Sequence, residues 1–347
     1  MSGPRLRIDL DAFAANLEVV RARVGPAQLM LIVKDDAYGH GIQWIAARAQ
    51  AEGVRWFGAF DLGEALTTRS VVGPEARVFS WLTVGSEQIG GALSADIDLG
   101  VGDASFLEDV ASVARAAGAT ARVHLKIDTG LHRNGVRPED WHGVLARVRV
   151  LQDEGLVRLV GVWSHIAEAS DEEDDTARAL FDDAVAAAEA TGFDLEVRHL
   201  SASAASFARP EFRYDLVRVG AFCYGIRSAG GPGESDLGIR PIASLTAPVT
   251  HVGDYAVAVG VGSLHGLPST IAQHAAFTVA GRRVDVQHVA EAHTAVTPWS
   301  GAAIGDEVTV FGAGGPSATD LAEAIGTVGE EILVRVSPLV PRTYRGE

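Results

Sequence analysis

The stretch "QLMLIVKDDAYGHGIQWIAARA" (residues 28–49) decides the fold, because an apolar run, a charged turn and an Ala-rich segment follow one another. The run over 28–33 is typical of a buried strand. The following segment repeats apolar residues at the spacing of one helix face, which consists of Ile42, Ile45, Ala46 and Ala49. Lys34 ends the strand, where a charged side chain either reaches back to solvent or serves chemistry.

The same strand-and-helix unit recurs along the first two thirds of the chain. Seven further strand candidates cover 54–60, 76–82, 95–101, 121–127, 156–166, 195–201 and 214–222, with Ala-rich segments between most of them. Eight strands with intervening helices predict an α/β fold, a (β/α)8 TIM barrel over residues 1–230. An open doubly wound sheet stays possible, because strand counts from one sequence err by one or two.

The pattern changes after residue 230. The segment "SAGGPGES" (228–235) has the composition of a linker. Beyond it we expect strands over 243–252, 255–261, 275–286, 306–312 and 331–336, and a single helix over 317–326. The sequence therefore predicts a separate C-terminal β domain over 231–347, which residues 1–10 could join as a further strand.

Composition narrows the class of protein. The 347 residues carry a formal charge of −16, which disfavours binding to nucleic acid or to an anionic membrane. We find no transmembrane stretch and no apolar signal core. A single cysteine, Cys223, excludes an internal disulfide and fits a reducing compartment, so we expect a cytoplasmic protein.

Polar side chains gather where the predicted strands end. In a (β/α)8 barrel the carboxyl ends of the strands face the active site. Seven candidates occupy these positions: Lys34, Lys126, Arg133, His165, Ser203, Arg218 and Gly220. The hydroxyl of Ser203 and the backbone N–H groups of Gly220 and Ala221 could bind a phosphate, since loops after the last two strands often do so. The Gly-rich stretches of the β domain lack nucleotide-binding spacing.

An ordered set of motifs covers nearly the whole chain. It consists of "IDLDAFAANL" (8–17), "VKDDAYGHG" (33–41), "KIDTGLHRNG" (126–135), "SHIAEASDEE" (164–173), "HLSASAAS" (199–206), "LVRVGAFCYG" (216–225), "GDEVTVFG" (305–312) and "GTVGEEILVRVSPLVPRTY" (326–344). The set resembles the alanine racemase family, the pyridoxal-5'-phosphate enzymes of fold type III. That resemblance implies an amino-acid racemase acting as a homodimer, in which the partner's β domain completes each site.

The resemblance also assigns roles to residues. Lys34 is similar to the lysine that forms a Schiff base with the cofactor, which needs a neutral amine. Residues similar to the family's phosphate site are Tyr38, Ser203, Gly220, Ala221 and Tyr344, and those near the pyridine ring are His165 and Arg218. Arg133 is similar to the arginine near the substrate carboxylate, and Lys126 to a lysine that is often carbamylated. Each of these residues also fits an ordinary loop, core or strand-end position.

The pattern breaks in the C-terminal domain. The family carries its second catalytic base, a tyrosine, in a G-Y-x-D-G-Y-P-R stretch, whereas this chain reads "GSLHGLPS" (262–269). Ser263 replaces the tyrosine, His265 the aspartate and Leu267 the second tyrosine. A substrate-contacting S-M-D stretch reads Glu291, Ala292 and His293 here.

These replacements leave the reaction open. A two-base racemase needs a proton donor on each face of a planar intermediate, and Lys34 can serve one face. Ser263 is a poor base, whereas His265 or His293 has a suitable pKa, and the smaller side chains make a substrate larger than alanine plausible. The alternatives are a one-base lyase or aldolase on the same fold and a non-catalytic protein that binds the cofactor. A sugar-processing barrel is disfavoured, because only Asp36 and Asp128 are candidate carboxylates, and we expect no metal site.

Overall fold

The computed structural model describes residues 3–168 and 170–346 and divides into two compact units, each described by itself here. The barrel unit comprises Val20–Lys34 and Ile42–Gly220. The β unit comprises Asp35–Gly41 and the described parts of residues 1–19 and 221–347. No helix within the described ranges combines the length and the hydropathy that crossing a bilayer requires.

The barrel unit holds eight parallel strands. They are β2 (Gln28–Ile32), β3 (Trp56–Asp61), β4 (Arg77–Leu82), β5 (Asp98–Val101), β6 (Ala121–Lys126), β7 (Val157–Trp163), β8 (Val197–His199) and β9 (Leu216–Val219). They pair in the order β8-β7-β6-β5-β4-β3-β2-β9. Hydrogen bonds from Arg218 N to Ser201 O and from Asp215 N to Arg198 O, each 3.2 Å long, link β9 to the β8 segment. The predicted (β/α)8 barrel is therefore confirmed, and all eight strand candidates form strands.

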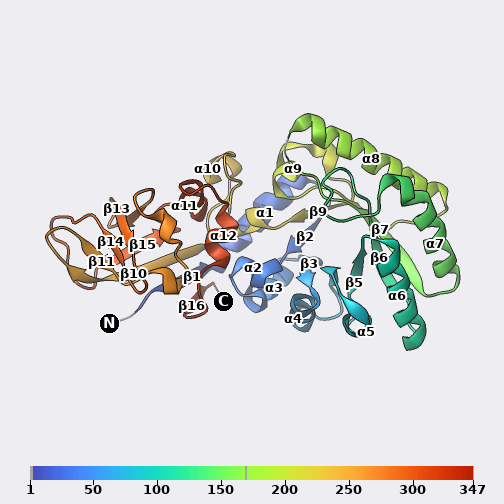
Figure 1. Cartoon of the computed structure of the whole chain (residues 1–347), viewed down its shortest axis with the longest axis horizontal. Helices are drawn as coiled ribbons and strands as arrows, with labels where there is room; N and C mark the ends of the chain where they lie inside the picture. Colours follow the sequence, from blue (N-terminus) through green and yellow to red (C-terminus); the bar gives the residue numbers. More distant parts are fainter. Residues whose placement is uncertain (1–2, 169, 347) are drawn as a thin grey trace. The chain divides into compact units, whose positions relative to one another are not determined.

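Helices lie between the strands of the barrel, on its outside (Figure 1). They are α3 (Ile42–Ala51), α4 (Leu62–Val72), α5 (Gly85–Ser94), α6 (Ala104–Ala117), α7 (Trp141–Asp153), α8 (Asp171–Ala190) and α9 (Ser203–Ala208), and α1 (Leu10–Val24) precedes the first of the eight strands. The predicted face of α3 is buried. Side chains of Asp61, Asp103 and Ser170 accept the backbone N–H three residues on, which fixes where α4, α6 and α8 begin.

Glycine makes room for large side chains inside the barrel. A Cβ on Gly58 would lie 2.6 Å from Ile32 Cδ1, and one on Gly161 would lie 2.7 Å from His124 Nδ1. Contacts this short force the neighbouring side chain to move. Glycine at these two positions thus leaves the space that Ile32 and His124 occupy.

The β unit holds the remaining strands. They are β1 (Arg5–Asp9), β10 (Ala243–Val252), β11 (Val257–Val259), β12 (Ala276–Val279), β13 (Arg282–Val289), β14 (Thr294–Val296), β15 (Glu307–Phe311) and β16 (Arg342–Arg345). They follow the order β11-β14-β13-β12-β15-β10-β1-β16. The N-terminal strand β1 runs antiparallel to β10 and parallel to β16. Two of these strands, β14 and β16, were not expected from the sequence.

The expected strand over 331–336 is wrong. These residues contribute to helix α12 (Gly329–Val334), whose buried residues include Ile332 and Leu333. Val336 is also buried, whereas Val334 is exposed, and this spacing belongs to a helix rather than to a strand. The expected helix over 317–326 is present as α11 (Ala318–Glu323), and α10 (Glu234–Leu237) is a further short helix.

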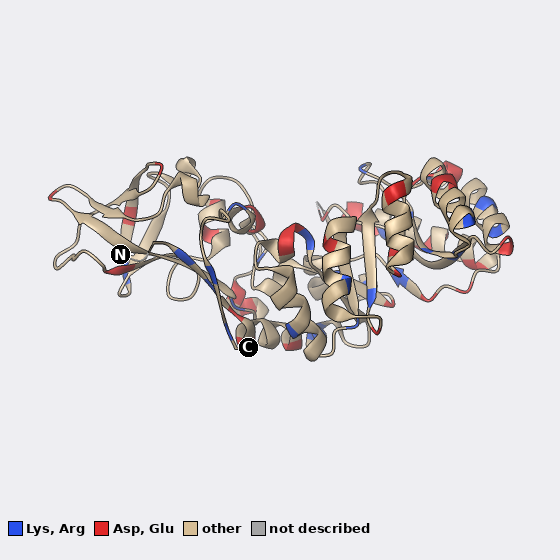
Figure 2. Cartoon of the chain, turned by 90° about the horizontal axis from the view of Figure 1, so that it is seen from below, with Lys and Arg blue, Asp and Glu red and all other residues tan. Residues whose placement is uncertain are grey.

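Acidic residues are spread over the ribbon with basic residues among them (Figure 2). The first turn of α8 alone carries Asp171, Glu172, Glu173 and Asp174, which suits the positive end of the helix dipole. Part of the excess of negative charge thus belongs to this helix end.

Candidate active site

The segment that follows β2 turns in the left-handed sense. Asp35, Asp36 and Ala37 have φ of 53–56° and ψ of 48–51°, and Tyr38 has φ of 55°. Left-handed backbone costs about 1–2 kcal/mol for each L-residue, so four such residues in a row are a strained arrangement that the surroundings must hold. The turn starts directly after Lys34, whose side chain is half-buried.

Lys126 and Arg218 lie over the same aromatic ring in the barrel. Nζ of Lys126 is 4.8 Å from the ring centre of Trp163, and Cζ of Arg218 is 5.2 Å from it. Burial and the charges of Arg218 and Arg133 lower the pKa of Lys126 to about 8. A sizeable fraction of Lys126 is therefore an uncharged amine at mildly alkaline pH.

Arg218, on β9, is a buried cation whose hydrogen-bond partners within the described chain include no carboxylate. Nη1 donates to His199 Nδ1 and His199 O over 2.9–3.1 Å. Nη2 donates to Ser164 O and Leu200 O over 2.7–2.8 Å and lies 3.2 Å from His165 Nδ1. Within the described chain, none of these hydrogen bonds uses Nε. The Nη groups are committed to the protein, which leaves Nε–H as the donor for a ligand.

His165 is held neutral beside these cations. Burial, followed by the charges of Arg218, Arg133, Lys126 and Lys34, lowers its pKa to about 3. Its Nδ1 lies 3.2 Å from Arg218 Nη2, and since a guanidinium only donates, an unprotonated Nδ1 suits this contact. The positive charges of four predicted site residues thus all act on the His165 ring.

The last two strands of the barrel end in a pair of polar groups. Gly220 N–H donates to the hydroxyl of Ser203 over 3.3 Å. Ser203 begins α9, and the N–H of Ala205 donates to a carboxylate oxygen of Glu168 over 2.9 Å. The first turn of α9 therefore already binds one carboxylate oxygen through a backbone N–H.

The loop after β6 presents Arg133. Asp128 accepts from the backbone N–H groups of Gly130 and His132 and from the His132 ring, over 3.0–3.1 Å. A Cβ on Gly135 would lie 2.6 Å from Asp128 N, so the loop closes tightly at this point. Arg133 is exposed between these fixed positions.

In the β unit, Tyr38 ends the left-handed turn, and Tyr344 on β16 contacts the residues that follow it. Tyr344 OH donates to His40 O over 3.0 Å, and Arg342 Nε donates to Gly39 O over 2.9 Å. Tyr38 packs against Tyr224, with ring centres 4.9 Å apart. Ala221, which follows Gly220 in the chain, is buried. Strand β16 thus holds the Gly39–His40 backbone and places Tyr344 beside it.

Residues 262–269, which depart from the family's tyrosine-containing stretch, include a tight turn in the β unit. Ser263–His265 is a 3-10 helix, and His265 Nδ1 accepts the N–H of Gly262 over 3.0 Å. Burial lowers the pKa of His265. His265 gains a proton on Nδ1 only if it releases that bond. Ser263 is exposed, whereas Leu267 is buried in the core.

A second turn of the β unit lies against the first. Leu264 N donates to Glu291 O over 3.0 Å, and Ser263 N donates to Ala290 O over 3.0 Å. His293 is exposed, and its carbonyl accepts from Ala290 N. The structure therefore brings the Ser263–His265 helix and the turn before His293 together.

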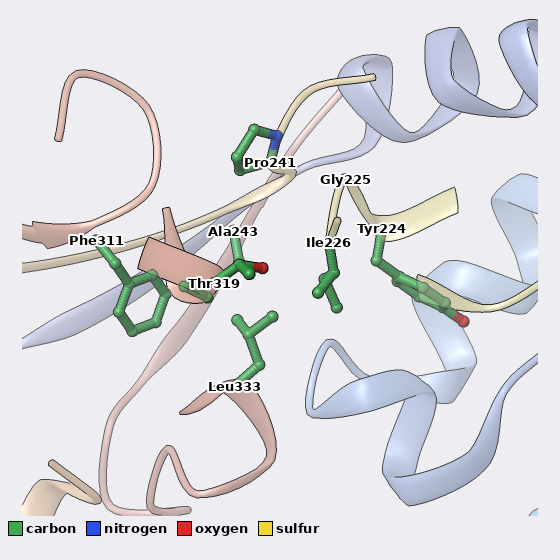
Figure 3. Close-up of a pocket in the computed structure, with 9 residues that line it drawn as sticks. Tyr224, Gly225, Ile226, Pro241, Ala243, Phe311, Thr319 and Leu333 are labelled. Atoms are coloured by element: carbon green, nitrogen blue, oxygen red, sulfur yellow. The ribbon is translucent and has the colours of Figure 1, made fainter. Parts of the chain in front are cut away.

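Figure 3 shows a small cavity in the β unit, of about 10 Å³ and hence about enough for one water molecule. Tyr224, Ile226, Pro241, Phe311 and Leu333 are among the residues that line it. Its apolar lining and its size make it a packing defect rather than a ligand site. A larger hollow of about 370 Å³ lies along β12 and α11 and includes His274, Phe277 and Arg283, none of them predicted site residues.

The donor set of the barrel fits pyridoxal phosphate. The cofactor needs a primary amine, a donor for its ring nitrogen and hydrogen-bond donors for its phosphate. Lys34 would supply the amine and Arg218 Nε–H the donor. Ser203, with Gly220 N–H beside it, supplies hydrogen-bonding groups of the kind that bind phosphate. These groups belong to the barrel unit, at the carboxyl ends of its strands.

Comparison with known proteins agrees with this fit. The family model for the alanine racemase N-terminal domain matches residues 8–228, and that for the C-terminal domain matches residues 248–344. Curated alanine racemases of Beutenbergia cavernae and Thermobifida fusca are 37% and 36% identical to the chain. The alignments cover 99% and 98% of this chain and 98% and 97% of theirs.

Solved structures show the same likeness. The alanine racemase of Streptomyces lavendulae superposes with a TM-score of 0.94 at 35% identity, over 100% of this chain and 98% of that one. The enzyme of Streptomyces coelicolor gives 0.96 at 33% identity, over 99% and 98%. Fold and site define a barrel enzyme of the pyridoxal-phosphate type. The chain belongs to the alanine racemase family, whose members are isomerases of that type.

Sequence reasoning missed several polar residues inside the barrel. They are Asp98, His124, Trp163 and His199, which are fully or nearly fully buried. One signal was available, because His124 precedes Lys126 by two residues and so faces the same side of β6. The chain alone did not indicate that these side chains meet.

Proposed function

We propose that the protein interconverts the L- and D-forms of an amino acid with the help of pyridoxal phosphate. Lys34 carries the cofactor, and Arg218 donates to its ring nitrogen. Ser203, Gly220, Ala221, Tyr38 and Tyr344 bind its phosphate, and His165 lies near its ring. The observation that carries this proposal is the buried guanidinium of Arg218, with both Nη groups committed to neutral acceptors.

When bound, the cofactor supplies an electron sink for the pair left by the α-proton of the amino acid. Burial lowers the pKa of Arg218 to about 9, so Arg218 still keeps its proton at neutral pH. It therefore favours an unprotonated ring nitrogen, which makes that sink weak. Negative charge then stays near the α-carbon, and this favours return of a proton there over transamination. Lys34 moves the proton on one face of the substrate.

Arg133 binds the substrate carboxylate, and Lys126 keeps Arg133 in place. The lowered pKa of Lys126 supports the carbamylation expected at this position, since only the uncharged amine reacts with carbon dioxide. Carbamylation turns the cation into an anion and gives the guanidinium a partner. Mass spectrometry of the intact protein in bicarbonate buffer tests this modification.

The second base comes from the C-terminal domain over residues 231–347. We propose His265 or Ser263 for this role, with His293 near the substrate carboxylate. The small side chains of Ser263 and Ala292 support a substrate larger than alanine. Three single variants, Ser263→Ala, His265→Ala and His293→Ala, separate the roles. Loss of the second base abolishes proton exchange for one enantiomer only, whereas loss of a binding group weakens both.

The active form is a homodimer in the cytoplasm, as in the family that the chain resembles. The partner is needed because Lys34 is the base that the barrel supplies, whereas the proposed second base belongs to the C-terminal domain.

Attachment of the cofactor tests the proposal directly. Borohydride reduction of the loaded protein, followed by peptide mapping, should place the cofactor mass on Lys34. Lys34→Ala should bind the cofactor without that covalent mass. A modified peptide elsewhere, or none in a protein shown to bind the cofactor, would overturn the assignment.

A further inference from the structure

A line of buried polar side chains crosses the inside of the barrel and is not used by the reaction proposed above. His199 on β8 contacts His124 on β6, with Nε2 and Nδ1 2.9 Å apart. His124 Nε2 lies 3.2 Å from Asp98 Oδ2 on β5. At the other end, His199 Nδ1 lies 3.1 Å from Arg218 Nη1. Asp98 and both histidines are 0% exposed.

The hydrogen bonds of this line run in one direction. A guanidinium only donates, so His199 Nδ1 accepts and the ring proton lies on Nε2. His199 Nε2–H then donates to His124 Nδ1, and the His124 proton must lie on Nε2. That proton is donated to Asp98. A proton on the wrong nitrogen of either ring would set two N–H groups against each other.

Asp98 is a fixed anion at the far end. Burial alone would raise its pKa, but the hydrogen bond from His124 and the charges of Arg77 and Arg122 outweigh it and hold the pKa at about 2. Arg77 donates to Oδ2 through Nε over 3.1 Å, and Arg122 donates to Oδ1. Asp98 and Arg77 are the first residues of β5 and β4, at the amino ends of the strands.

Packing holds both imidazole rings in place. Trp163 stacks on His199 at 5.6 Å with an angle of 7° between the planes, and its Nε1 donates to His124 O. Phe79 lies 4.7 Å from the His124 ring centre. Gly161 leaves the space that His124 Nδ1 occupies. Neither ring can turn without breaking this packing.

We propose that Asp98, His124 and His199 form a positioning relay that fixes Arg218 as a one-way donor and keeps its Nε–H for the ring nitrogen of the cofactor. In this relay Arg218 Nη1 donates to His199 Nδ1. The proton of His199 stays on Nε2 because His124 accepts it, and His124 in turn donates to Asp98. The inference rests on the proposed function, since it needs the cofactor ring to meet Arg218. None of the three relay residues touches the reacting atoms.

Two substitutions at one position cut different links. His124→Gln keeps an amide near Asp98 and loses the acceptor for His199. His124→Asn keeps a group near His199 and loses the donor to Asp98. His142, exposed on α7, provides the matched control His142→Asn. Both His124 variants should bind pyridoxal phosphate roughly tenfold more weakly, which corresponds to one lost charge-assisted hydrogen bond.

Two readouts separate positioning from mere stability. In the apoprotein, ¹⁵N NMR of labelled imidazoles should place the proton on Nε2 in both His124 and His199. In the loaded protein, the visible absorption of the cofactor and its pH profile should shift in both His124 variants and stay unchanged in His142→Asn. Thermal unfolding is recorded beside both, so that a variant that does not fold is recognised.

The possible outcomes are distinct. A proton on Nδ1 of either ring in the wild-type apoprotein overturns the relay, whether or not the variants fold. Folded His124 variants with a wild-type spectrum, pH profile and affinity also overturn it, while cofactor bonded to Lys34 leaves the proposed function intact. A wild-type protein without cofactor on Lys34 overturns both.

Discussion

Lys126 shows how a single residue couples burial to pH. Its pKa of about 8 in the folded chain lies below the ordinary 10.5, because burial and the charges of Arg218 and Arg133 disfavour its ammonium form. The unfolded chain therefore binds more protons between these two values. The ammonium form of Lys126 therefore lowers the free energy of unfolding below pH 8. This free energy rises again as the pH increases from 8 to 10.5.

Replacement by an uncharged side chain should remove this penalty. We expect Lys126→Met to be more stable than the wild type at pH 6.5, by on the order of 1–3 kcal/mol. The gain should shrink as the pH rises from 8 to 10. Urea unfolding of both apoproteins at several pH values measures it, in buffers free of bicarbonate so that Lys126 stays an unmodified amine. A difference that does not change with pH would show that Lys126 is not a destabilised cation.

Gly161 supports the polar interior of the barrel by having no side chain. Gly161→Ala should destabilise the protein by about 1–3 kcal/mol, since its Cβ would lie 2.7 Å from His124 Nδ1 and 2.9 Å from Val197 O. Gly143, exposed in α7 with nothing within 4 Å of its Cβ, is the control. Gly143→Ala should instead stabilise by about 0.5–1 kcal/mol. Equal effects in thermal unfolding would refute the packing argument.

At the scale of elements, the left-handed turn after β2 is the least ordinary segment. A β-branched residue tolerates this conformation worst, and glycine adopts it freely. Asp35→Gly should leave stability within about 1 kcal/mol of the wild type, while Asp35→Val should lose about 1–2 kcal/mol. Chemical denaturation of the three proteins decides this. An Asp35→Val protein as stable as Asp35→Gly would mean that the turn is not left-handed.

The sequence predicted regular elements well and irregular ones poorly. Eight strands followed from apolar runs, because parallel strands are buried on both faces. Helix α12 was mistaken for a strand, since "EILVRV" (331–336) is rich in β-branched residues and short runs carry little period. The conformational propensities of the residues do not predict the four consecutive left-handed residues Asp35–Tyr38. Tertiary contacts hold this segment, and these are not visible in the sequence.

Some features of the candidate site could likewise be predicted from the sequence, and others could not. Charged residues at strand ends, such as Lys34 and Arg218, could be predicted, because topology fixes where strand ends lie. The partners of Arg218 could not, since His199 is brought to it by the closure of the barrel rather than by spacing in the chain. Tyr344 was assigned by resemblance alone, and its bond to His40 joins residues 304 positions apart.

At the scale of the whole molecule, the proposed homodimer makes a testable demand. If Lys34 of one protomer works with His265 of its partner, then Lys34→Ala and a second-base variant such as His265→Ala should each be inactive alone. Mixed and refolded in equal amounts, they should recover about a quarter of wild-type activity, because half of the dimers then hold one complete site. Light scattering confirms the dimer, and a mixture without activity would argue against shared sites.

The central claim is that the protein inverts the α-carbon of an amino acid, and exchange of the α-proton tests it most directly. The loaded protein is incubated in D2O with the separate enantiomers of alanine, serine, lysine and threonine, while NMR follows the α-proton and chiral chromatography follows configuration. We expect deuterium to enter with inversion from both enantiomers of at least one amino acid. Exchange in one enantiomer without inversion, or glycine and an aldehyde from threonine, would contradict the account.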